Sequence, residues 1–393
     1  MLSYNGELYN YRDLRHRLKE QWTFRTQGDV EVVLAGLVRY GPDFLTLMEG
    51  MWALALWDDQ SQDLLLVRDR MGQKPLYYQT DCRRMACASE LGALSALSWH
   101  PWQEDFRSTA DYLRYGYYLP GTTAYKGVRE VLPGHWLRWK AGRAPTLQAY
   151  WRISPGGLSV SRNKACEALR ETIIQGVKRR LVADVEVGAL LSGGIDSSLV
   201  VSIVRSELHK PIKTFCMGFQ DDSFDERVYA RRMAQQCSSD HYEGYLDLAS
   251  QAGLVDRLLH QVGQPFGDAS LLPPALVSSL AAGRVKVALS GDGGDELFSG
   301  YQRYLGRCLL RWYTRLPEQL RRTAARVLAR WDEPGAHHSA SLLKKAHLFM
   351  DAAQRVDDET PYIAPLAYSA SNFRNLLPDL HRLGHPPPRL PRA

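Results

Sequence analysis

The sequence is poor in cysteine and lacks both a long hydrophobic run and an excess of one charge. Its six cysteines form no Cys-x-x-Cys pair and have no histidine partner at zinc-ligand spacing, which argues against a disulfide framework and a structural zinc site. No apolar stretch reaches the roughly 20 residues that a membrane helix needs, and the first residues show no signal-peptide pattern. We therefore expect free thiols, a cytoplasmic protein and no membrane partner.

Acidic and basic residues nearly balance. The chain has 49 Lys and Arg against 43 Asp and Glu, a net charge of +6, and only residues 321–330 approach a basic cluster. This pattern is typical of a solvated surface and predicts no nucleic-acid partner. With 393 residues, 45% of them hydrophobic, the chain is long enough for two domains that each bury a core.

The strongest local signal is LSGGIDSS at residues 191–198. An apolar, β-branched run leads into it and predicts a buried strand, and residues 199–208 have the apolar spacing of a helix. A strand, a glycine turn and a helix start form a phosphate site, because free backbone N–H groups and the helix dipole converge there. No Gly-Lys-Ser/Thr follows, so this is not a Walker A loop. The plainer alternative is a capped glycine turn.

A second glycine-rich stretch, SGDGGDELFSGY, occupies residues 290–301 and follows another buried run at 285–289. Strands at 185–191, 212–219 and 285–289 alternate with helices at 199–208, 224–237 and 254–262. This alternation predicts a doubly wound parallel α/β sheet that binds its ligand beyond the carboxyl ends of the strands. Asp196 and Asp295 each follow a glycine turn, and we expect them to share Mg²⁺ on a polyphosphate.

The N-terminal region has a different pattern. Helices are predicted at 11–20 and 29–40, and short strands at 51–57, 64–68, 76–78 and 85–88, which indicates an α+β layer. Taken by themselves, Asn5-Gly6 is typical of a type I′ hairpin turn and Asp29 of a helix N-cap.

These motifs together carry a family resemblance. NGELYNY at 5–11, GDVE at 28–31 and RDRMGQKPLYY at 68–78 resemble the class II glutamine amidotransferase domain of asparagine synthetases. LSGGIDSS resembles the signature of PP-loop ATP-pyrophosphatases, and SGDGGDELFSGYQRY resembles asparagine synthetases within that group. The resemblance implies a partial Ntn-type amidotransferase domain at residues 1–150 and a PP-loop synthetase domain at 165–393 with an incomplete C-terminal part.

The activity implied by the resemblance is the ATP-dependent amidation of the aspartate β-carboxylate through β-aspartyl-AMP, with nitrogen from glutamine or ammonia. Its cofactors are ATP and Mg²⁺, and a homodimer is a further expectation. The implied glutamine-binding residues are Asn5, Gly6, Glu7 and Asp29. The implied ATP and pyrophosphate contacts are Leu191, Ser192, Gly193, Gly194, Asp196, Ser197, Ser198, Met217, Ser290 and Gly291, with Asp196 and Asp295 on the metal and Asp292 in the acyl-adenylate step.

The sequence departs from the family at three points. Position 2 is Leu2, where the family has the cysteine nucleophile whose free α-amine serves as its base. The arginine that binds the glutamine carboxylate and the later Lys-x-Asp-Arg motif have no counterpart. We therefore expect that this chain, as written, is a fragment that does not hydrolyse glutamine.

Two other functions fit the same motifs. A related amidotransferase could act on another carboxylate, since substrate choice in this fold lies near residues 264–274 and in the part without a counterpart. A truncated paralogue could bind nucleotide or partner subunits without turnover. Alternatively, Met217 is a core residue and Asp225 a helix cap.

Overall fold

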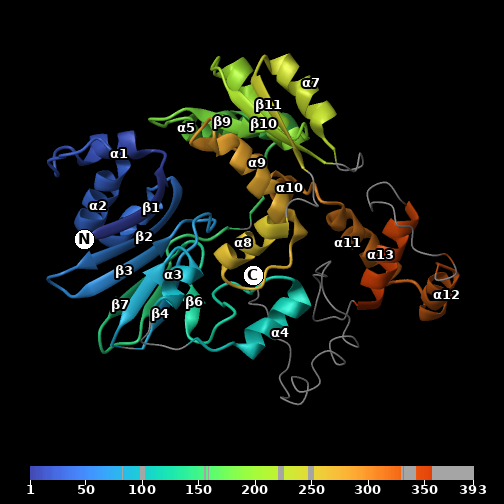
Figure 1. The fold of residues 1–393 in the computed structure, drawn as a ribbon, viewed down its shortest axis with the longest axis horizontal. Helices are drawn as coiled ribbons and strands as arrows, with labels where there is room; N and C mark the ends of the chain where they lie inside the picture. Colours follow the sequence, from blue (N-terminus) through green and yellow to red (C-terminus); the bar gives the residue numbers. More distant parts are fainter. Residues whose placement is uncertain are drawn as a thin grey trace. The chain divides into compact units, whose positions relative to one another are not determined.

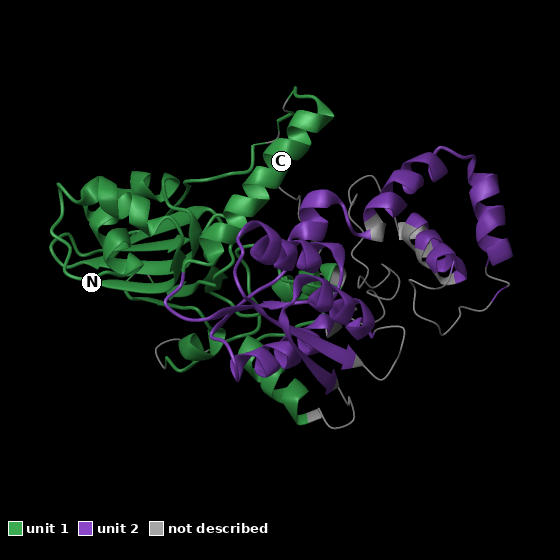
Figure 2. Ribbon diagram, turned by 90° about the horizontal axis from the view of Figure 1, so that it is seen from above, with its two compact units in different colours: residues 1–182, 250–268, 383–393 green, residues 183–249, 269–382 purple. Residues whose placement is uncertain are grey.

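The computed structural model describes residues 1–81, 83–97, 102–154, 156–157, 159–219, 225–246, 252–328, 331 and 342–355 (Figure 1). The chain forms two compact units (Figure 2). The first unit comprises residues 1–182, 250–268 and 383–393, and the second comprises 183–249 and 269–382. The sequence domains predicted above, 1–150 and 165–393, divide the chain at other positions and stay a prediction.

Antiparallel sheets form the frame of the first unit, as expected of an α+β domain. The five-stranded sheet has the order β1 (Leu2–Leu8), β2 (Gly50–Asp58), β3 (Asp63–Arg68), β7 (His135–Lys140) and β8 (Thr146–Ala149). The three-stranded sheet has the order β5 (Met85–Ala88), β4 (Tyr77–Thr80) and β6 (Val128–Glu130). The strands predicted at 51–57, 64–68 and 85–88 are confirmed. The short strands β6 and β8 were not predicted, because three or four residues carry little periodicity.

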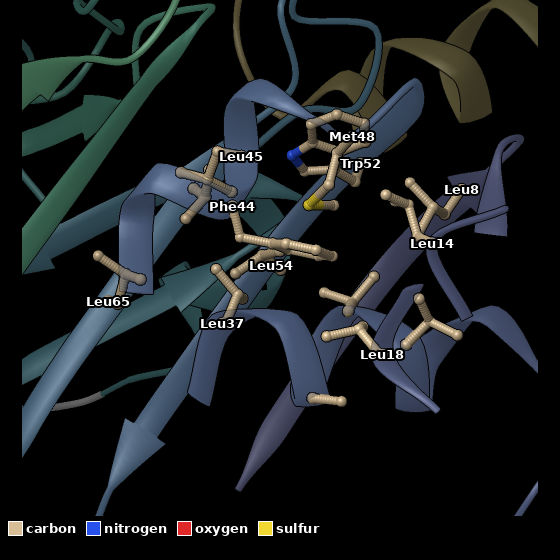
Figure 3. Close-up of a cluster of buried hydrophobic side chains, with 14 residues drawn as sticks. Leu8, Leu14, Leu18, Leu37, Phe44, Leu45, Met48, Trp52, Leu54 and Leu65 are labelled. Atoms are coloured by element: carbon tan, nitrogen blue, oxygen red, sulfur yellow. The ribbon is translucent and has the colours of Figure 1, made fainter. Parts of the chain in front are cut away.

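The main core of the first unit lies between the five-stranded sheet and the helices α1 (Tyr11–Leu18), α2 (Asp29–Tyr40) and η1 (Gly41–Thr46). The apolar residues of α2 recur at helical spacing and are fully buried, Val32 and Val33 among them. Figure 3 shows Phe44, Trp52 and Leu54 at the centre of this cluster. The predicted helix at 29–40 is thus confirmed at both ends.

Four further helices belong to the first unit: α3 (Leu91–Ser95), α4 (Phe106–Tyr115), α5 (Arg162–Arg180) and α8 (Ala252–Val262). The last of them lies in residues 250–268, here called the returning segment, because it follows strand β11 (Asp240–Leu246) of the second unit in sequence but folds with the first. Helix α8 packs on α3. Tyr125 Oη donates to the Gly263 carbonyl at 2.8 Å, and the Ala124 N–H donates to Gln264 Oε1 at 3.1 Å.

The second unit contains the predicted parallel sheet, so the α/β fold class is confirmed. Its strands have the order β11 (Asp240–Leu246), β10 (Lys213–Phe219), β9 (Val187–Leu190) and β12 (Val287–Leu289), and every pair is parallel. Strands β10 and β11 lie on one side of β9 and β12 lies on the other. The strand order therefore reverses between β9 and β12, which is where such sheets bind ligands.

Helices α6 (Ile195–Ser202), with its π-helical continuation η2 (Ile203–Glu207), α7 (Arg227–Cys237) and α9 (Leu272–Ala282) connect these strands. Strand β11 and helix α9 were not predicted, because the charges of β11 and the prolines of α9 obscure their periods. The chain continues through η4 (Ala269–Leu271), α10 (Gly294–Phe298), α11 (Gln302–Tyr313), α12 (Glu318–Leu328) and α13 (Leu342–Arg355). Within the described ranges, no helix is long and apolar enough to cross a membrane.

Candidate functional site

The LSGGIDSS stretch forms a tight loop between β9 and α6. The Leu191 N–H donates to the Phe215 carbonyl at 2.8 Å, which extends the ladder of β9 by one residue. Gly193 has φ +82°, a conformation that favours glycine. Gly194 is extended and caps α6, and the Ser198 N–H donates to its carbonyl at 3.0 Å.

Helix α6 therefore begins earlier than the sequence predicts. The expected helix starts at residue 199, whereas the structure starts it at Ile195, because the extended Gly194 allows the next residue to enter the helix. Asp196, Ser197 and Ser198 consequently lie in the first helical turn, where the N–H groups ahead of Ser198 have no partner within the helix and the dipole is positive. This difference improves the loop as an anion site.

Two serine hydroxyls fix the shape of this loop. Ser192 Oγ lies 3.0 Å from Ser197 Oγ and accepts from the Gly194 N–H at 3.2 Å. Ser197 is buried, and Ser192 is half-buried. The loop is thus held by hydrogen bonds from its own side chains.

The second glycine-rich loop follows β12. Ser290 Oγ donates to Asp292 Oδ2 at 2.9 Å, Gly293 has φ +91°, and α10 begins at Gly294. The loop therefore presents the Asp292 carboxylate and a short helix start at the carboxyl end of its strand.

The structure brings the two loops together. Strands β9 and β12 are paired neighbours with Leu289 opposite Ala189, so both loops leave the same edge of the sheet. A Cβ at Gly291 would lie 2.8 Å from the Ser197 nitrogen, and one at Gly294 would collide with the Asp196 carboxylate. The two glycine-rich loops are therefore in contact at one edge of the sheet; that they form a single ligand site stays a prediction.

The carboxylates suit a metal that arrives with a nucleotide. The Asp196 carboxylate lies against Gly294, whereas the Asp295 carboxylate lies against Gly300. Throughout the described part of the chain, no group of three or more His, Cys, Asp or Glu side chains is arranged to hold a metal ion by itself. Mg²⁺ binds through as few as one or two carboxylates when phosphate oxygens supply the rest, so the Asp196 carboxylate at the edge of the sheet fits a nucleotide-bound Mg²⁺.

Met217 lies near the carboxyl end of β10 and is half-buried. Its thioether packs against Gly244 of β11, where a Cβ would lie 2.9 Å from Met217 Sδ and 3.4 Å from Leu280. Met217 thus belongs to the side of the sheet that α9 covers.

Residues of the first unit predicted to bind glutamine lie on β1 and at the start of α2. Asn5-Gly6 is not a hairpin turn: both residues are inside β1, where Asn5 pairs with Ala53. The turn expectation fails because the partner strand is supplied by β2, far along the chain. The Asn5 side chain donates to Ser89 Oγ at 3.1 Å. Asp29 is the first residue of α2, next to the cap Gly28.

Asp29 and the Asn-Gly-Glu strand meet through the backbone. The Leu8 N–H, one residue after Glu7, donates to Asp29 Oδ2 at 2.9 Å. Burial and the nearby Asp29 and Glu7 carboxylates raise the pKa of Tyr4, which keeps this phenol neutral beside them. The structure thus places Asp29 against the backbone of β1 just after Glu7, and the Asn5 side chain points toward Ser89.

Sequence reasoning missed Asp69, which organises the RDRMGQKP loop. Its carboxylate is fully buried and accepts the N–H groups of Trp52, Met71, Gln73 and Lys74 at 2.9–3.3 Å. The Arg-Asp-x-x-Gly spacing was the available signal, because a turn closed by glycine presents several N–H groups to one preceding carboxylate.

Comparison with known proteins agrees with both halves of this description. The family described as "Asparagine synthase" matches residues 168–384, and the family described as "Glutamine amidotransferase domain" matches residues 1–151. A putative glutamine-hydrolysing asparagine synthetase of Mycobacterium tuberculosis is 32% identical over 388 residues, which is 96% of this chain and 58% of that protein.

Two further relatives extend the comparison. A putative glutamine-hydrolysing asparagine synthetase 2 of Methanocaldococcus jannaschii is 31% identical and is covered over 67% of its length by 88% of this chain. Amidase chyE of Penicillium rubens is 31% identical over 76% of this chain and 47% of its own length. The chain spans about half to two thirds of the length of these relatives. Because the family model matches more than half of the chain and a relative is 31% identical over 67% of its own length, the chain belongs to the asparagine synthase family.

Proposed function

We propose that this chain carries the synthetase chemistry of its family: ATP-dependent amidation of the aspartate β-carboxylate, with nitrogen from glutamine or ammonia. The observation that carries the proposal is the meeting of Asp196 and Ser197 with Gly291 and Gly294 at the ends of two adjacent parallel strands. A site that joins a helix N-terminus to a second carboxylate-bearing loop suits a polyphosphate with its cation.

The proposed reaction has two steps. First, a β-carboxylate oxygen of aspartate attacks the α-phosphorus of ATP, the bond to the β-phosphate breaks, and pyrophosphate leaves. Second, ammonia attacks the carbonyl carbon of β-aspartyl-AMP, AMP leaves with the bonding electron pair, and the nitrogen loses a proton. The main demand on the protein is to hold pyrophosphate while it departs.

The loop residues have matching proposed roles. Free N–H groups in the first turn of α6 and the hydroxyls of Ser192, Ser197 and Ser198 hold pyrophosphate. Backbone groups of Leu191 and Met217, with Ser290 and Gly291, contact the rest of the nucleotide, and Gly193 and Gly194 allow the phosphates to approach. Asp292, oriented by the Ser290 hydroxyl, serves the acyl-adenylate step.

Asp196 and Asp295 are proposed to hold Mg²⁺ with the nucleotide. When bound, the ion would neutralise phosphate charge and favour departure of pyrophosphate. The two carboxylates contribute by fixing the triphosphate relative to the two loops. For the first unit, the proposed glutamine contacts are Asn5, Gly6, Glu7 and Asp29. The cytoplasmic location and the homodimer stay predictions of the sequence.

The test is pyrophosphate release by the whole chain with ATP, Mg²⁺ and aspartate, in parallel with ammonia and with glutamine. We expect release that depends on aspartate and is supported by ammonia. An Asp196→Asn variant should reduce it at least tenfold, whereas Asp184→Asn, before β9, should not. Glutamate formed from glutamine would contradict the expectation that this chain does not hydrolyse glutamine.

A second acceptor is favoured by one comparison. The likeness to an amidase extends over 76% of this chain, so a carboxylate other than aspartate is the alternative substrate. Pyrophosphate release with other carboxylic acids, but not with aspartate, would select this alternative. ATP binding without release for any carboxylate tried would instead indicate a nucleotide-binding paralogue.

A further inference from the structure

Two arginine–carboxylate pairs hold the beginning of helix α7. Arg227 Nε and Nη2 donate to the Asp225 carboxylate at 2.6–3.0 Å. Arg231 Nε and Nη2 donate to the two oxygens of Glu243 on β11 at 3.0 and 2.6 Å. Both pairs use the guanidinium as a fork, which fixes orientation as well as distance. These four residues are here called the arginine clamp.

The clamp is fitted to the sheet below it. The Arg227 side chain crosses β10 at Gly218, where any Cβ would collide with it, and its guanidinium lies 5.1 Å from the centre of the Tyr245 ring on β11. Arg227 and Arg231 are four residues apart and therefore share one face of α7. Together they fix the first turns of α7 against β10 and β11.

Those first turns pack directly against the LSGGIDSS loop, here called the phosphate loop because it is the proposed pyrophosphate site. A Cβ at Gly193 would lie 2.5 Å from the Ala230 nitrogen and from the Tyr229 carbonyl carbon. The other end of α7 is held independently, because Arg205 Nε donates to the Cys237 carbonyl at 2.7 Å. Loosening of the clamp should therefore move the start of α7 without releasing the whole helix. Because Gly193 packs directly on that start, the backbone of the LSGGIDSS loop at Gly193 should move as well.

We propose that Arg227 and Arg231 are positioning residues that set the phosphate end of the nucleotide site through α7 and Gly193. The inference rests on the proposed function. The inference also predicts that a change in the clamp weakens binding of the phosphates more than binding of the adenosine part of the nucleotide. Met217, the proposed contact beyond the phosphates, packs with Gly244 and Leu280 under α9, whereas the clamp lies on the α7 side.

The experiment measures dissociation constants of the whole chain for ATP, pyrophosphate and adenosine in the presence of Mg²⁺. The variants are Arg227→Lys, Arg231→Lys and the double variant, which keep the charge but lose the fork. Arg232→Lys is the matched control, because Arg232 is exposed on the same helix. Asp225→Asn removes the carboxylate charge that pairs with Arg227, and it replaces Arg227→Lys in the experiment if that variant does not fold.

We expect the double variant to weaken ATP and pyrophosphate binding about tenfold, the equivalent of about 1.4 kcal/mol, and to leave adenosine binding within about twofold. Arg232→Lys should change none of the three. Equal losses for ATP and adenosine, or no loss for pyrophosphate, would overturn the inference while the proposed function stands. An unaltered chain that binds neither ATP nor pyrophosphate would overturn the proposed function, and the inference with it.

Discussion

Single carboxylates with several backbone donors set the loops of the first unit. Asp69 accepts four N–H groups while fully buried. Its neighbour Arg68 donates to the carbonyls of Gly72, Lys74 and Val131 and pairs with Glu130 at 2.7 Å. One buried acid and one buried base thus bind both sides of the same loop, which explains how a loop with few apolar residues stays ordered.

Asp69→Asn should destabilise the first unit by about 2–3 kcal/mol, because an amide replaces a charged acceptor and turns a donor toward other N–H groups. Urea unfolding followed by tryptophan fluorescence measures the change. The control is Asp43→Asn, at an exposed position in η1. A loss below about 0.5 kcal/mol would show that water or relaxation replaces these hydrogen bonds.

Glu31 predicts a pH dependence. Its carboxylate accepts from the N–H groups of Arg25 and Thr26, the Thr26 hydroxyl and the Trp22 indole. These bonds, led by those from Arg25, lower the pKa of Glu31 to about 2. The folded-state pKa is therefore below the unfolded value, so the stabilisation is complete above about pH 4.5 and is lost as the pH falls toward 2.

The unaltered protein should unfold at higher urea than Glu31→Gln at pH 7, and the two midpoints should converge as the pH falls from 4.5 to 2. Equilibrium unfolding at several pH values measures this. Glu20→Gln, at an exposed position, should follow the unaltered protein throughout. A gap between the Glu31→Gln and unaltered midpoints that is constant down to pH 2 would refute the assignment.

At the scale of elements, two hydrogen bonds and apolar packing join the described part of the returning segment to the rest of the first unit. The Tyr125 hydroxyl donates to the Gly263 carbonyl of the segment, and Gln264 Oε1 of the segment accepts from the Ala124 N–H. Helix α8 also packs on α3. Because the Ala124 amide donates directly to Gln264 Oε1, its hydrogen exchange reports whether the segment is docked.

Tyr125→Phe should cost about 1 kcal/mol of docking and so accelerate exchange of the Ala124 amide about fivefold, while amides of β2 and β3 keep their rates. Hydrogen exchange with peptide-level mass analysis measures both. Tyr117→Phe, at a residue 56% exposed, is the control. Uniform acceleration across the first unit would show a general loss of stability instead.

At the scale of the whole molecule, the two glycine-rich loops belong to the second unit alone. Both loops, their strands and the arginine clamp lie between residues 183 and 300, outside the returning segment. A ligand that binds only the folded second unit should therefore stabilise that unit by mass action.

ATP with Mg²⁺ at about 100 times its dissociation constant should stabilise the second unit by about 2.7 kcal/mol. The measurement is slower hydrogen exchange in β9 and β12, compared with the same protein without nucleotide. In the Asp196→Asn variant this protection should be much smaller at equal ATP. Protection confined to strands of the first unit would place the nucleotide elsewhere.

The sequence alone determined the features that depend on neighbouring residues. LSGGIDSS and the second glycine-rich stretch, with the strands before them, predicted a parallel sheet and two loops at its edge. Helix α2 was predicted at about residues 29–40 and found there, because its apolar spacing and Gly41 act locally. The start of α6 was misplaced by four residues, since the backbone of Gly194 decides it.

Only the tertiary structure decided what depends on distant partners. It placed Asn5-Gly6 in a strand because β2 supplies hydrogen bonds across more than forty residues. It also folded residues 250–268 with the first unit, buried Asp69 among four N–H donors, and set Arg231 against Glu243 on the helix that packs on the LSGGIDSS loop. Such contacts follow from packing and charge pairing between separate elements, for which a local pattern holds no signal.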